Sequence, residues 1–494
     1  MTPSPRAPRG RRVAPGPLRA GLQRQELVEE VTRALAPLEA GAAALVAVSG
    51  GPDSTALVAL AQETRPDVAL TLGHIRHGLR DDRADVAAVH ALSAALGLPL
   101  RVSEVTVRRG GHGLEAAARV ARYAALARLG AAVVADRDGP CWLLVGHTAD
   151  DQAETLLLRL ARGTGLTGLG GMAPVRGRVV RPLLRVRRSD VRRFVALEGL
   201  HAVEDPTNLD LDVRRVRVRH HVVPGLQAVA SDPIGALARL ADLARDDACY
   251  LESEAARVAA AVVRPYGPAR AVPTDDLVGL DPAIGGRVVR RLLGEVRASD
   301  VPVTAAHVAA VLDLDGGSAV DVPGATVTRG GGWIAAVPAD VAPPSPVDLE
   351  IPGTATWPCA GLLLRATVAG TGPGGQLPLA LDVPWRPPSR DVAPSAIPPG
   401  GDPALAHLVL PAAVTDRALI VRGRRPGDRV TTAAGTRKLQ DLLVDAGVPR
   451  AVRDLLPVVV AGDGTILWVP GVVADAAAAA AGREAPAVEL AVEV

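Results

Sequence analysis

Apolar runs of strand length alternate with helix-forming runs along the first third of the chain. Strand patterns occupy 42–48, 68–75, 100–107 and 141–146, and helix patterns occupy 55–61, 84–96 and 114–129. Gly97 and Gly130, which follow the last two helical runs, are typical helix stops. This alternation predicts an α/β domain with a Rossmann-like, doubly wound parallel sheet.

The pattern changes after Pro224. Apolar residues then recur at helical spacing at six positions: Leu237, Leu240, Ala241, Ala244, Ala248 and Leu251. A further helix is expected at 303–314 and short antiparallel strands at 319–337. Together these patterns predict a second domain of helical or α+β type.

Shifts in composition mark the domain boundaries. Stretches rich in proline and glycine at 341–346 and 384–403 indicate the exit from the second domain and a loop within the C-terminal part of the chain. Residues 1–24 hold six arginines and no acid, which is typical of a disordered basic tail. We therefore expect four parts: a tail at 1–24, the α/β domain at 25–225, a middle domain at 226–342, and a linker with a small α/β C-terminal domain at 343–494.

The turn between the first strand and the first helix is the segment Ser49-Gly50-Gly51-Pro52-Asp53-Ser54. Unpaired N–H groups and the positive end of the helix dipole meet there, and two glycines leave room for an anion. The lysine of the common mononucleotide loop is missing, and an aspartate stands inside the loop instead. The segment predicts a phosphate-binding loop of a different kind. The alternative is a glycine-rich turn with an Asp or Ser helix cap.

Charge, hydropathy and cysteine content limit the class of protein and its cellular compartment. The net charge of +2 says little about partners, because the charges are segregated along the chain. No uninterrupted apolar stretch of 18 residues occurs and the N-terminus lacks the apolar core of a signal peptide, so we expect a soluble, cytoplasmic protein without a membrane partner. Cys141, Cys249 and Cys359 stand far apart, which argues against disulfides, a zinc ribbon or an iron–sulfur cluster.

Polar clusters follow the predicted strands, at the end of a parallel sheet where ligands bind. One runs from His74 to Arg80 and includes His77; another runs from Gly146 to Thr155 and includes Asp151 and Glu154. Asp151 and Glu154 are three residues apart at the start of a helix, so they share a face. An N-terminal capping arrangement would explain the same acids.

The phosphate loop resembles the PP-loop of the ATP pyrophosphatase superfamily. With it stand several further motifs: His74-x-x-His77-Gly-Leu-Arg, Glu115-x-x-Ala118-Arg119-x-x-Arg122-Tyr123, His147-x-x-Asp150-Asp151-Gln152-x-Glu154-Thr155, Arg162-Gly163-x-Gly165, Glu204-Asp205-Pro206-Thr207-Asn208 and Arg215-x-Arg217-x-Arg219-His220. In this order they resemble the tRNA(Ile)-lysidine synthetases. The resemblance is strong over about 42–225. Arg76, Val216 and His221 depart from residues that are usual in the family, which leaves the contacts of their loops open.

The resemblance implies a two-step ligase reaction. ATP adenylates the C2 carbonyl oxygen of the wobble cytidine in the CAU-anticodon tRNA(Ile) and releases pyrophosphate; the ε-amine of free L-lysine then displaces AMP. ATP and Mg²⁺ would be required, with RNA and not DNA as partner. Because the chain has one Phe and three Tyr, we expect hydrogen bonds and aliphatic contacts, more than stacking, to hold the cytidine.

On this basis each candidate residue has an expected role. The catalytic set is Asp53, Asp151, Glu154 and Arg119, and Asp53 is also the metal ligand. Asp151 and Glu154 would hold the lysine ammonium or take its proton. The ATP-binding set is Ser49, Gly50, Gly51, Pro52, Asp53, Ser54, His74 and His77. The two histidines could be metal ligands, but phosphate or nucleotide contacts are favoured; for Arg119 and Arg122 a solvated helix face is the alternative.

Arginine-rich segments indicate where RNA would bind. Eight arginines lie between Arg176 and Arg193, and the alternation of Arg215, Arg217 and Arg219 would place all three on one face of an extended segment. A merely solvated charge run is the alternative. Segment 418–473 resembles the family's tRNA-gripping C-terminal domain and holds Lys438, the one lysine in the sequence. The RNA-binding set is Arg122, Arg215, Arg217, Arg219, Arg424, Arg425 and Lys438.

Two other functions remain open at this point. One is another PP-loop enzyme, such as a tRNA thiolase or an amidotransferase-type ligase, although no cysteine pair or glutaminase segment supports it. The other is a catalytically silent RNA-binding protein on the same scaffold. Release of pyrophosphate from ATP would separate an enzyme from the silent protein.

Overall fold

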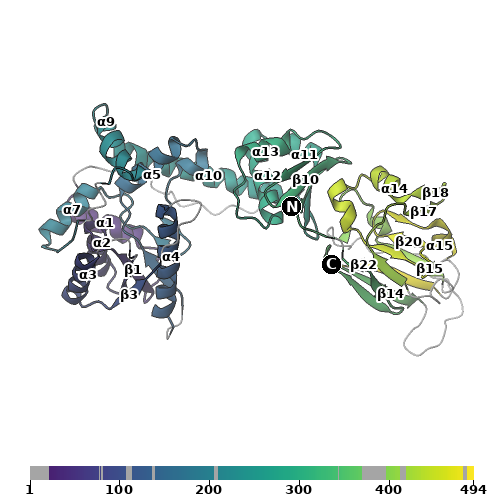
Figure 1. Cartoon of the computed structure of the whole chain (residues 1–494), viewed down its shortest axis with the longest axis horizontal. Coiled ribbons are helices and arrows are strands. Elements are labelled where there is room, and N and C mark those ends of the chain that lie inside the picture. Colours follow the sequence, from purple (N-terminus) through teal and green to yellow (C-terminus); the bar gives the residue numbers. More distant parts are fainter. Residues whose placement is uncertain are drawn as a thin grey trace, which may run out of the picture. The chain divides into compact units, whose positions relative to one another are not determined.

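The computed structural model describes residues 22–76, 78, 82–106, 114–135, 139–204, 210–342, 344–369, 396–411, 419–481 and 487–493. The chain forms two compact units, 1–249 and 250–494, which we describe separately (Figure 1). The predicted tail at 1–24 lies almost entirely outside the described residues. Within them, no helix is both long and apolar enough to span a bilayer.

The first unit is built on a six-stranded sheet with the order β3-β2-β1-β4-β6-β5. Its strands are β1 (Ala43–Val48), β2 (Ala69–Arg76), β3 (Leu100–Glu104), β4 (Cys141–Leu144), β5 (Val175–Arg176) and β6 (Val179–Val180). All neighbours pair in parallel except β5 with β6. The predicted doubly wound, mostly parallel sheet is therefore confirmed.

Helices cover both faces of this sheet because successive strand residues point to opposite sides. On one face, Val46 packs in a core with α1 (Arg24–Ala34), α2 (Pro52–Thr64), α3 (Arg83–Leu96) and α7 (Arg188–Leu197). On the other face, Leu45 and Ile75 pack against Leu126 of α4 (Leu114–Val133). The helix expected to stop at Gly130 continues to Val133. Gly130 lies within this helix and faces the side chain of Cys141.

The remaining elements of the first unit lie beyond β4. They are α5 (Ala149–Leu160), α6 (Leu166–Leu169), α8 (Arg214–Arg217), a π-helix (Val218–Val222) and α9 (Val223–Gln227). The long helix α10 (Pro233–Val262) comes next in the chain and includes the six apolar positions predicted to be helical.

The second unit begins with an antiparallel five-stranded sheet in the order β7-β8-β11-β10-β9. These strands are β7 (Arg264–Tyr266), β8 (Ala269–Pro273), β9 (Ala319–Val322), β10 (Ala325–Gly330) and β11 (Trp333–Pro338), with α11 (Thr274–Val278), α12 (Pro282–Val296) and α13 (Ala305–Leu312). Leu293 of α12, Val311 of α13 and Ile334 of β11 share one core. The expected helix at 303–314 and strands at 319–337 are both present.

The C-terminal part of this unit consists of antiparallel sheets with two short helices. One sheet contains β12 (Val347–Leu349), β16 (Leu419–Arg422), β19 (Val458–Val460), β20 (Ile466–Val469) and β21 (Val473–Ala474). A second contains β13 (Gly353–Trp357), β14 (Leu362–Ala369), β22 (Ala487–Glu493) and β15 (His407–Pro411). The hairpin β17 (Arg429–Thr432) and β18 (Gly435–Lys438) leads into α14 (Leu439–Asp445); α15 (Ala476–Ala481) lies before β22. Buried Trp357 and Trp468 anchor a shared core.

Candidate active site

The phosphate loop is a tightly pinned turn between β1 and α2. Ser54 Oγ accepts a hydrogen bond from Ser49 N (3.1 Å) and donates one to the Gly51 carbonyl (3.0 Å). Gly51 is the N-cap of α2 and Pro52 occupies its first turn, so the free N–H groups of this helix start face the loop. The geometry is that of an anion site at a helix N-terminus.

Two glycines are required where backbone segments approach the loop. Gly50 has φ +86°, and a Cβ there would lie 3.2 Å from the Asp85 carbonyl oxygen. Gly146, which follows β4, would place a Cβ 3.0 Å from the Asp53 carbonyl oxygen. The end of β4 therefore sits directly against the start of α2, and the residues after Gly146 are brought beside the phosphate loop.

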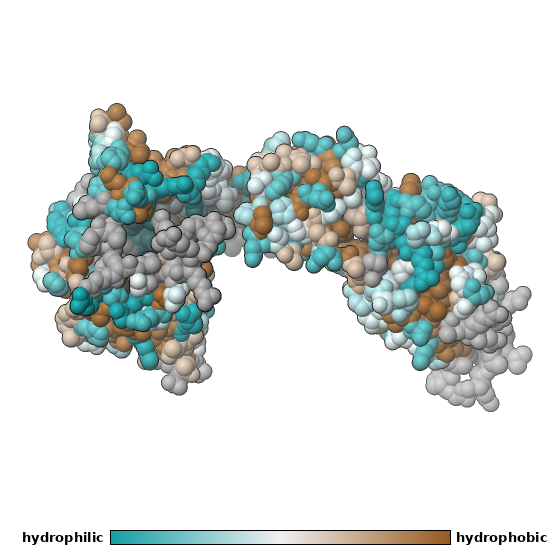
Figure 2. Space-filling model, in the orientation of Figure 1, coloured by the Kyte–Doolittle hydropathy of each residue, from teal (hydrophilic) through white to brown (hydrophobic). Residues whose placement is uncertain are grey.

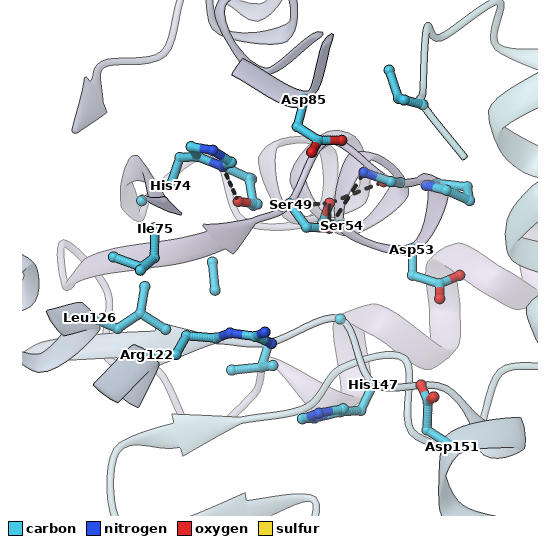
Figure 3. A pocket seen from close by; sticks show the side chains of 18 of the residues that line it. Ser49, Asp53, Ser54, His74, Ile75, Asp85, Arg122, Leu126, His147 and Asp151 are labelled. Carbon is cyan, nitrogen blue, oxygen red and sulfur yellow. Dashed lines mark hydrogen bonds between the residues drawn. The ribbon is translucent and has the colours of Figure 1, made fainter. Parts of the chain in front are cut away.

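A pocket of about 530 Å³ opens over this loop, a size suited to a nucleotide. Figure 3 shows Ser49, Ser54 and Asp53 on one side of it, and Arg122, His147 and Asp151 on the other. Apolar Ile75 and Leu126 line the end away from Asp53 and Asp151. The pocket thus has an apolar end and a charged end.

Asp53 lies at the charged end with an incomplete set of partners. Its Oδ1 is buried and has no hydrogen-bond partner among the described residues, and its Oδ2 is 3.8 Å from Arg188 Nε. Burial, with the charge of Asp151, raises the pKa of Asp53 from 3.8 to about 7, against the opposing effect of Arg188. A carboxylate in this state would gain from a bound cation.

His74 lies on the Ser49 side of the pocket. Its ring Nδ1 is 2.9 Å from the Val48 carbonyl oxygen, so Nδ1 carries the proton and donates. The side chain is buried, and its Nε2 has no partner in the described part of the chain. The other histidine predicted to bind ATP, His77, lies outside the described residues.

Asp151 and Glu154 belong to α5, whose N-cap is Thr148. Asp151 Oδ2 accepts hydrogen bonds from Thr148 N (2.7 Å) and Oγ1 (3.0 Å), and Thr148 Oγ1 accepts from Asp151 N (3.4 Å). The capping arrangement considered from the sequence is therefore real, with Thr148 as the partner of Asp151. It fixes that carboxylate so that only Oδ1 points toward the other charged groups.

Three arginines surround these two acids. Arg188 donates to Asp151 Oδ1 (2.8 Å) and Glu154 Oε1 (3.2 Å). Arg215 donates to Asp151 Oδ1 (2.9 Å) and Glu154 Oε2 (2.6 Å). Arg219 donates to Glu154 Oε1 (2.8 Å) and Oε2 (3.3 Å). We call these five residues the carboxylate–arginine cluster.

The arginine segment is helical and not extended, so that part of the prediction is wrong. Arg215 lies in α8 and Arg219 in the π-helix, four residues apart, and both reach Glu154. Arg217 is exposed, on a different side from the other two. A helix forms because α8 packs on α5, where the buried carboxylates attract the guanidinium groups.

The cluster holds its acids ionised. Burial alone would raise the pKa of Asp151, but Arg215 and Arg188 outweigh it and lower the pKa to about 2. Burial would also raise the pKa of Glu154, but the three arginines outweigh burial and lower that pKa. Asp151 and Glu154 are therefore weak proton acceptors, and the expectation that either takes a proton from the lysine amine does not fit their surroundings.

Arg119 and Arg122 of α4 both line the pocket. The Arg119 guanidinium stacks over the Tyr123 ring at 5.2 Å, and the Tyr123 hydroxyl is buried without a hydrogen-bond partner in the described residues. Both arginines remain exposed, as a surface that meets a ligand would be. At the end of β2, Arg76 forms a bidentate ion pair with Asp82 (2.9 Å to each oxygen).

Sequence patterns assigned Arg188 no role of its own. It stands in the run of eight arginines between 176 and 193, most of which have protein partners: Arg185 bonds Asp242, Arg187 bonds Asp232, Arg192 bonds Glu204 and Arg193 bonds Asp190. Arg188 starts α7, which packs on α2, and this packing carries it to the phosphate loop. The sequence signal that could have found Arg188 is its position as the first residue of the helix that follows the last strand of the sheet.

The C-terminal basic residues lie around β16, β17, β18 and α14, over which Figure 2 shows a largely hydrophilic surface. Arg424 pairs with Asp454 (2.7 Å) and also bonds Gln440, whereas Lys438 and Arg425 are exposed. Several of the positive charges in this surface are thus matched by acids of the same unit.

A parallel sheet whose first strand-to-helix turn is this phosphate loop defines a PP-loop protein, and a PP-loop domain model matches residues 23–226. A model of the TilS substrate C-terminal domain matches residues 419–490. The tRNA(Ile)-lysidine synthase of Symbiobacterium thermophilum is 38% identical over 476 residues, covering 89% of this chain and 91% of the relative. The same-named protein of Thermobifida fusca is 43% identical over 304 residues (60% and 91%), and that of Chromobacterium violaceum 34% over 453 residues (88% and 93%). The chain belongs to the tRNA(Ile)-lysidine synthase family.

Proposed function

We propose that this protein is an ATP-dependent ligase that joins L-lysine to C2 of the wobble cytidine in the CAU-anticodon tRNA(Ile). The observation that carries the proposal is the shared pocket. Asp53 on the phosphate loop and Asp151, Arg188 and Arg219 of the carboxylate–arginine cluster line one cavity, and Arg188 contacts both aspartates. One site for ATP activation and one for a charged amino acid are thereby adjacent, as a two-step ligation requires.

The residues present fit a Mg²⁺ ion beside the triphosphate. Asp53 offers a buried, unpartnered oxygen whose carboxyl holds its proton up to about pH 7 unless a cation is near. Among the described residues no three His, Cys, Asp or Glu side chains form a metal site, so phosphate oxygens and water would complete the coordination. Bound there, Mg²⁺ would neutralise the charge that develops on the phosphates.

In the first step the loop and the pocket arginines hold ATP for in-line attack. N–H groups at the start of α2, with Ser49 and Ser54, face the phosphates, while Arg119 and Arg122 reach in from α4. The cytidine O2 forms a bond to the α-phosphorus as the bond to the bridging oxygen of pyrophosphate breaks. The products are an adenylated tRNA and pyrophosphate.

In the second step the carboxylate–arginine cluster would bind the amino-acid end of lysine. Every carboxylate oxygen of Asp151 and Glu154 already accepts hydrogen bonds, so these acids act by orienting Arg188, Arg215 and Arg219. Guanidinium groups suit the α-carboxylate of lysine, and the acids supply the opposite charge for its α-ammonium. The neutral ε-amine then attacks C2, the C2–O bond breaks, and AMP leaves.

RNA contacts would come from two places. Arg217, which is exposed, and Arg122 of the pocket would meet the anticodon region. Arg425 and Lys438 of the second unit, with Arg424, would meet the backbone of the tRNA body through phosphate contacts.

Incubation with ATP, labelled lysine and total tRNA, followed by nucleoside analysis, tests the proposal. Label in lysidine is the expected result. Without lysine, pyrophosphate should form in an amount roughly equal to the tRNA(Ile) present, because activation precedes attack. Absence of pyrophosphate would favour a silent RNA-binding protein, and pyrophosphate without lysine transfer would favour another PP-loop enzyme.

A pair of variants tests whether the carboxylate–arginine cluster serves lysine transfer or ATP binding. Glu154→Gln should slow lysine transfer much more than pyrophosphate release, whereas Glu63→Gln, which alters an exposed ion pair with Arg24 away from the pocket, should change neither. Equal loss of both steps in Glu154→Gln would place the cluster in ATP binding and contradict its assignment to lysine.

A further inference from the structure

His147 is a pocket residue that the steps above leave without a task. It lies between β4 and α5, and its N–H donates to the Val145 carbonyl (3.0 Å) in a tight turn. Gly146 before it touches the α2 start, and Thr148 after it caps α5. The ring is therefore held from both sides, and Figure 3 shows it beside Asp151, across the pocket from Ser49 and Ser54.

The ring nitrogen Nδ1 of His147 is buried and has no hydrogen-bond partner among the described residues. Buried polar atoms without partners are uncommon in folded proteins because their lost hydration is not replaced. Since His147 lines the pocket, a ligand that packs against its ring is the natural source of a partner. Nδ1 therefore marks a position where a bound substrate forms a hydrogen bond.

The surroundings of His147 keep its ring neutral. Burial, together with Arg215, Arg181 and Arg119, lowers the pKa of His147 to about 3, although Asp151 opposes the shift. A neutral imidazole has one N–H donor and one lone-pair acceptor. It is therefore neither a cationic clamp for phosphate nor a proton acceptor at neutral pH.

Two of the proposed reactants carry an uncharged base, the wobble cytidine and ATP. The apolar end of the pocket at Ile75 and Leu126 suits the adenine, whereas His147 lies beside Asp151, which leaves cytosine as the base that His147 would meet. The phosphates and the amino-acid end of lysine are served by charged groups, and Arg119 and Arg122 of the pocket offer donors for the O2 and N3 acceptors of the base. A free acceptor for the 4-amino group is scarcer. The acids of the carboxylate–arginine cluster are engaged, and His74 lies on the Ser49 side.

We infer that His147 is a specificity-determining residue that selects cytosine over uracil by accepting a hydrogen bond from the 4-amino group at Nδ1. Uracil carries an oxygen at this position, and its lone pairs would face the Nδ1 lone pair. A neutral ring is essential here, because an imidazolium would donate from both nitrogens and favour uracil. This inference rests on the proposed function, which supplies the wobble cytidine.

The test compares three tRNA(Ile) substrates that carry cytidine, uridine or pyrimidin-2-one riboside at the wobble position. The last lacks only the 4-amino group. Pyrophosphate release without lysine gives kcat/KM for each, and equilibrium binding gives an affinity that needs no catalysis. Wild type should prefer cytidine over pyrimidin-2-one by about 10- to 100-fold, the range for one buried hydrogen bond.

His147→Leu should lose this preference and bring cytidine down to the level of pyrimidin-2-one. His147→Asn should keep most of it, because the amide oxygen can stand near the Nδ1 position and accept the same bond. His90→Leu, an exposed substitution on α3, serves as the matched control and should keep the full wild-type preference. Rescue by asparagine distinguishes base reading from a structural role.

If His147→Leu slows all three substrates by the same factor, the preference survives and the inference is overturned, because the ring then acts on ATP or on packing. Wild type that binds cytidine tRNA preferentially through His147 but releases no pyrophosphate would support the inference while refuting the proposed ligase activity. Wild type that binds cytidine and pyrimidin-2-one tRNA equally would overturn the inference whatever its activity.

Discussion

Replacing Asp53 by asparagine should stabilise the ligand-free protein while abolishing pyrophosphate release. Burial and the charge of Asp151 raise the pKa of Asp53 to about 7, so the proton binds more tightly in the folded state than in the unfolded state. A raised pKa contributes stability below the unfolded value near 4, and this contribution is lost as the pH rises through 7. Asparagine has no charge to bury and avoids that loss.

The size of the effect follows from the shift. At pH 8 the carboxyl is ionised in both the folded and the unfolded state. A rise of roughly three in pKa then lowers the unfolding free energy by about 4 kcal/mol relative to the protein with a protonated Asp53. At pH 5 most of the folded protein keeps the proton, and the cost falls to roughly 1.5 kcal/mol. Asp53→Asn should therefore be more stable than wild type by a margin that grows between pH 5 and pH 8.

Native-state hydrogen exchange of the β1 and α2 amides measures this locally, which avoids treating the two units as one transition. Asp246→Asn, an exposed change on α10, is the control and should show no pH-dependent gain. Adding Mg²⁺ with ATP should protect wild type and leave the variant unchanged. Equal or lower protection of the variant at pH 8 would refute the buried-charge argument, and normal pyrophosphate release would refute the role of Asp53.

Three further changes test the rest of the molecule. Glu154→Gln removes a buried negative charge from three half-buried guanidinium groups and should cost about 3–5 kcal/mol in urea unfolding, against less than about 1 kcal/mol for the exposed Glu63→Gln. Gly146→Ala should lower ATP affinity by roughly tenfold or more in a titration, since its Cβ would press on the start of α2. Replacing Arg425 and Lys438 together by alanine should flatten the slope of log tRNA affinity against log salt by about 1.5, with ATP binding unchanged; an unaltered slope would make that surface merely solvated.

Periodicity alone was sufficient for four of the six strands in the sheet of the first unit, whereas the two-residue strands β5 and β6 were not predicted. The strands predicted at 42–48 and 68–75 form β1 (Ala43–Val48) and β2 (Ala69–Arg76), because central parallel strands are buried on both faces and read as continuous apolar runs. The phosphate loop was predictable because its glycines and hydroxyls are contiguous. Helix ends were less predictable: Gly130 indicates a stop, yet the helix continues to Val133.

The carboxylate–arginine cluster could not be derived in this way. Arg188, Arg215 and Arg219 stand 34, 61 and 65 residues from Glu154, and a basic residue that pairs with a buried acid looks the same in sequence as one that faces RNA. Local spacing also misled. Arg215 and Arg219 share a face in a strand and in a helix alike, whereas Arg217 joins them only in a strand.

The two aspartates that face each other across the pocket show why pairing matters more than residue type. Asp151 is fixed by Thr148 and two arginines, and its pKa is lowered to about 2; Asp53, in the same cavity, has one guanidinium at 3.8 Å, and its pKa is raised to about 7. Environments that separate the pKa values of two carboxyl groups in this manner suit them to different roles. Asp151 gains less from a metal ion because two guanidinium groups already compensate most of its charge. The uncompensated oxygen of Asp53 is where a metal ion would gain most, which supports the proposed placement of Mg²⁺ on the phosphate loop and of lysine on the arginines.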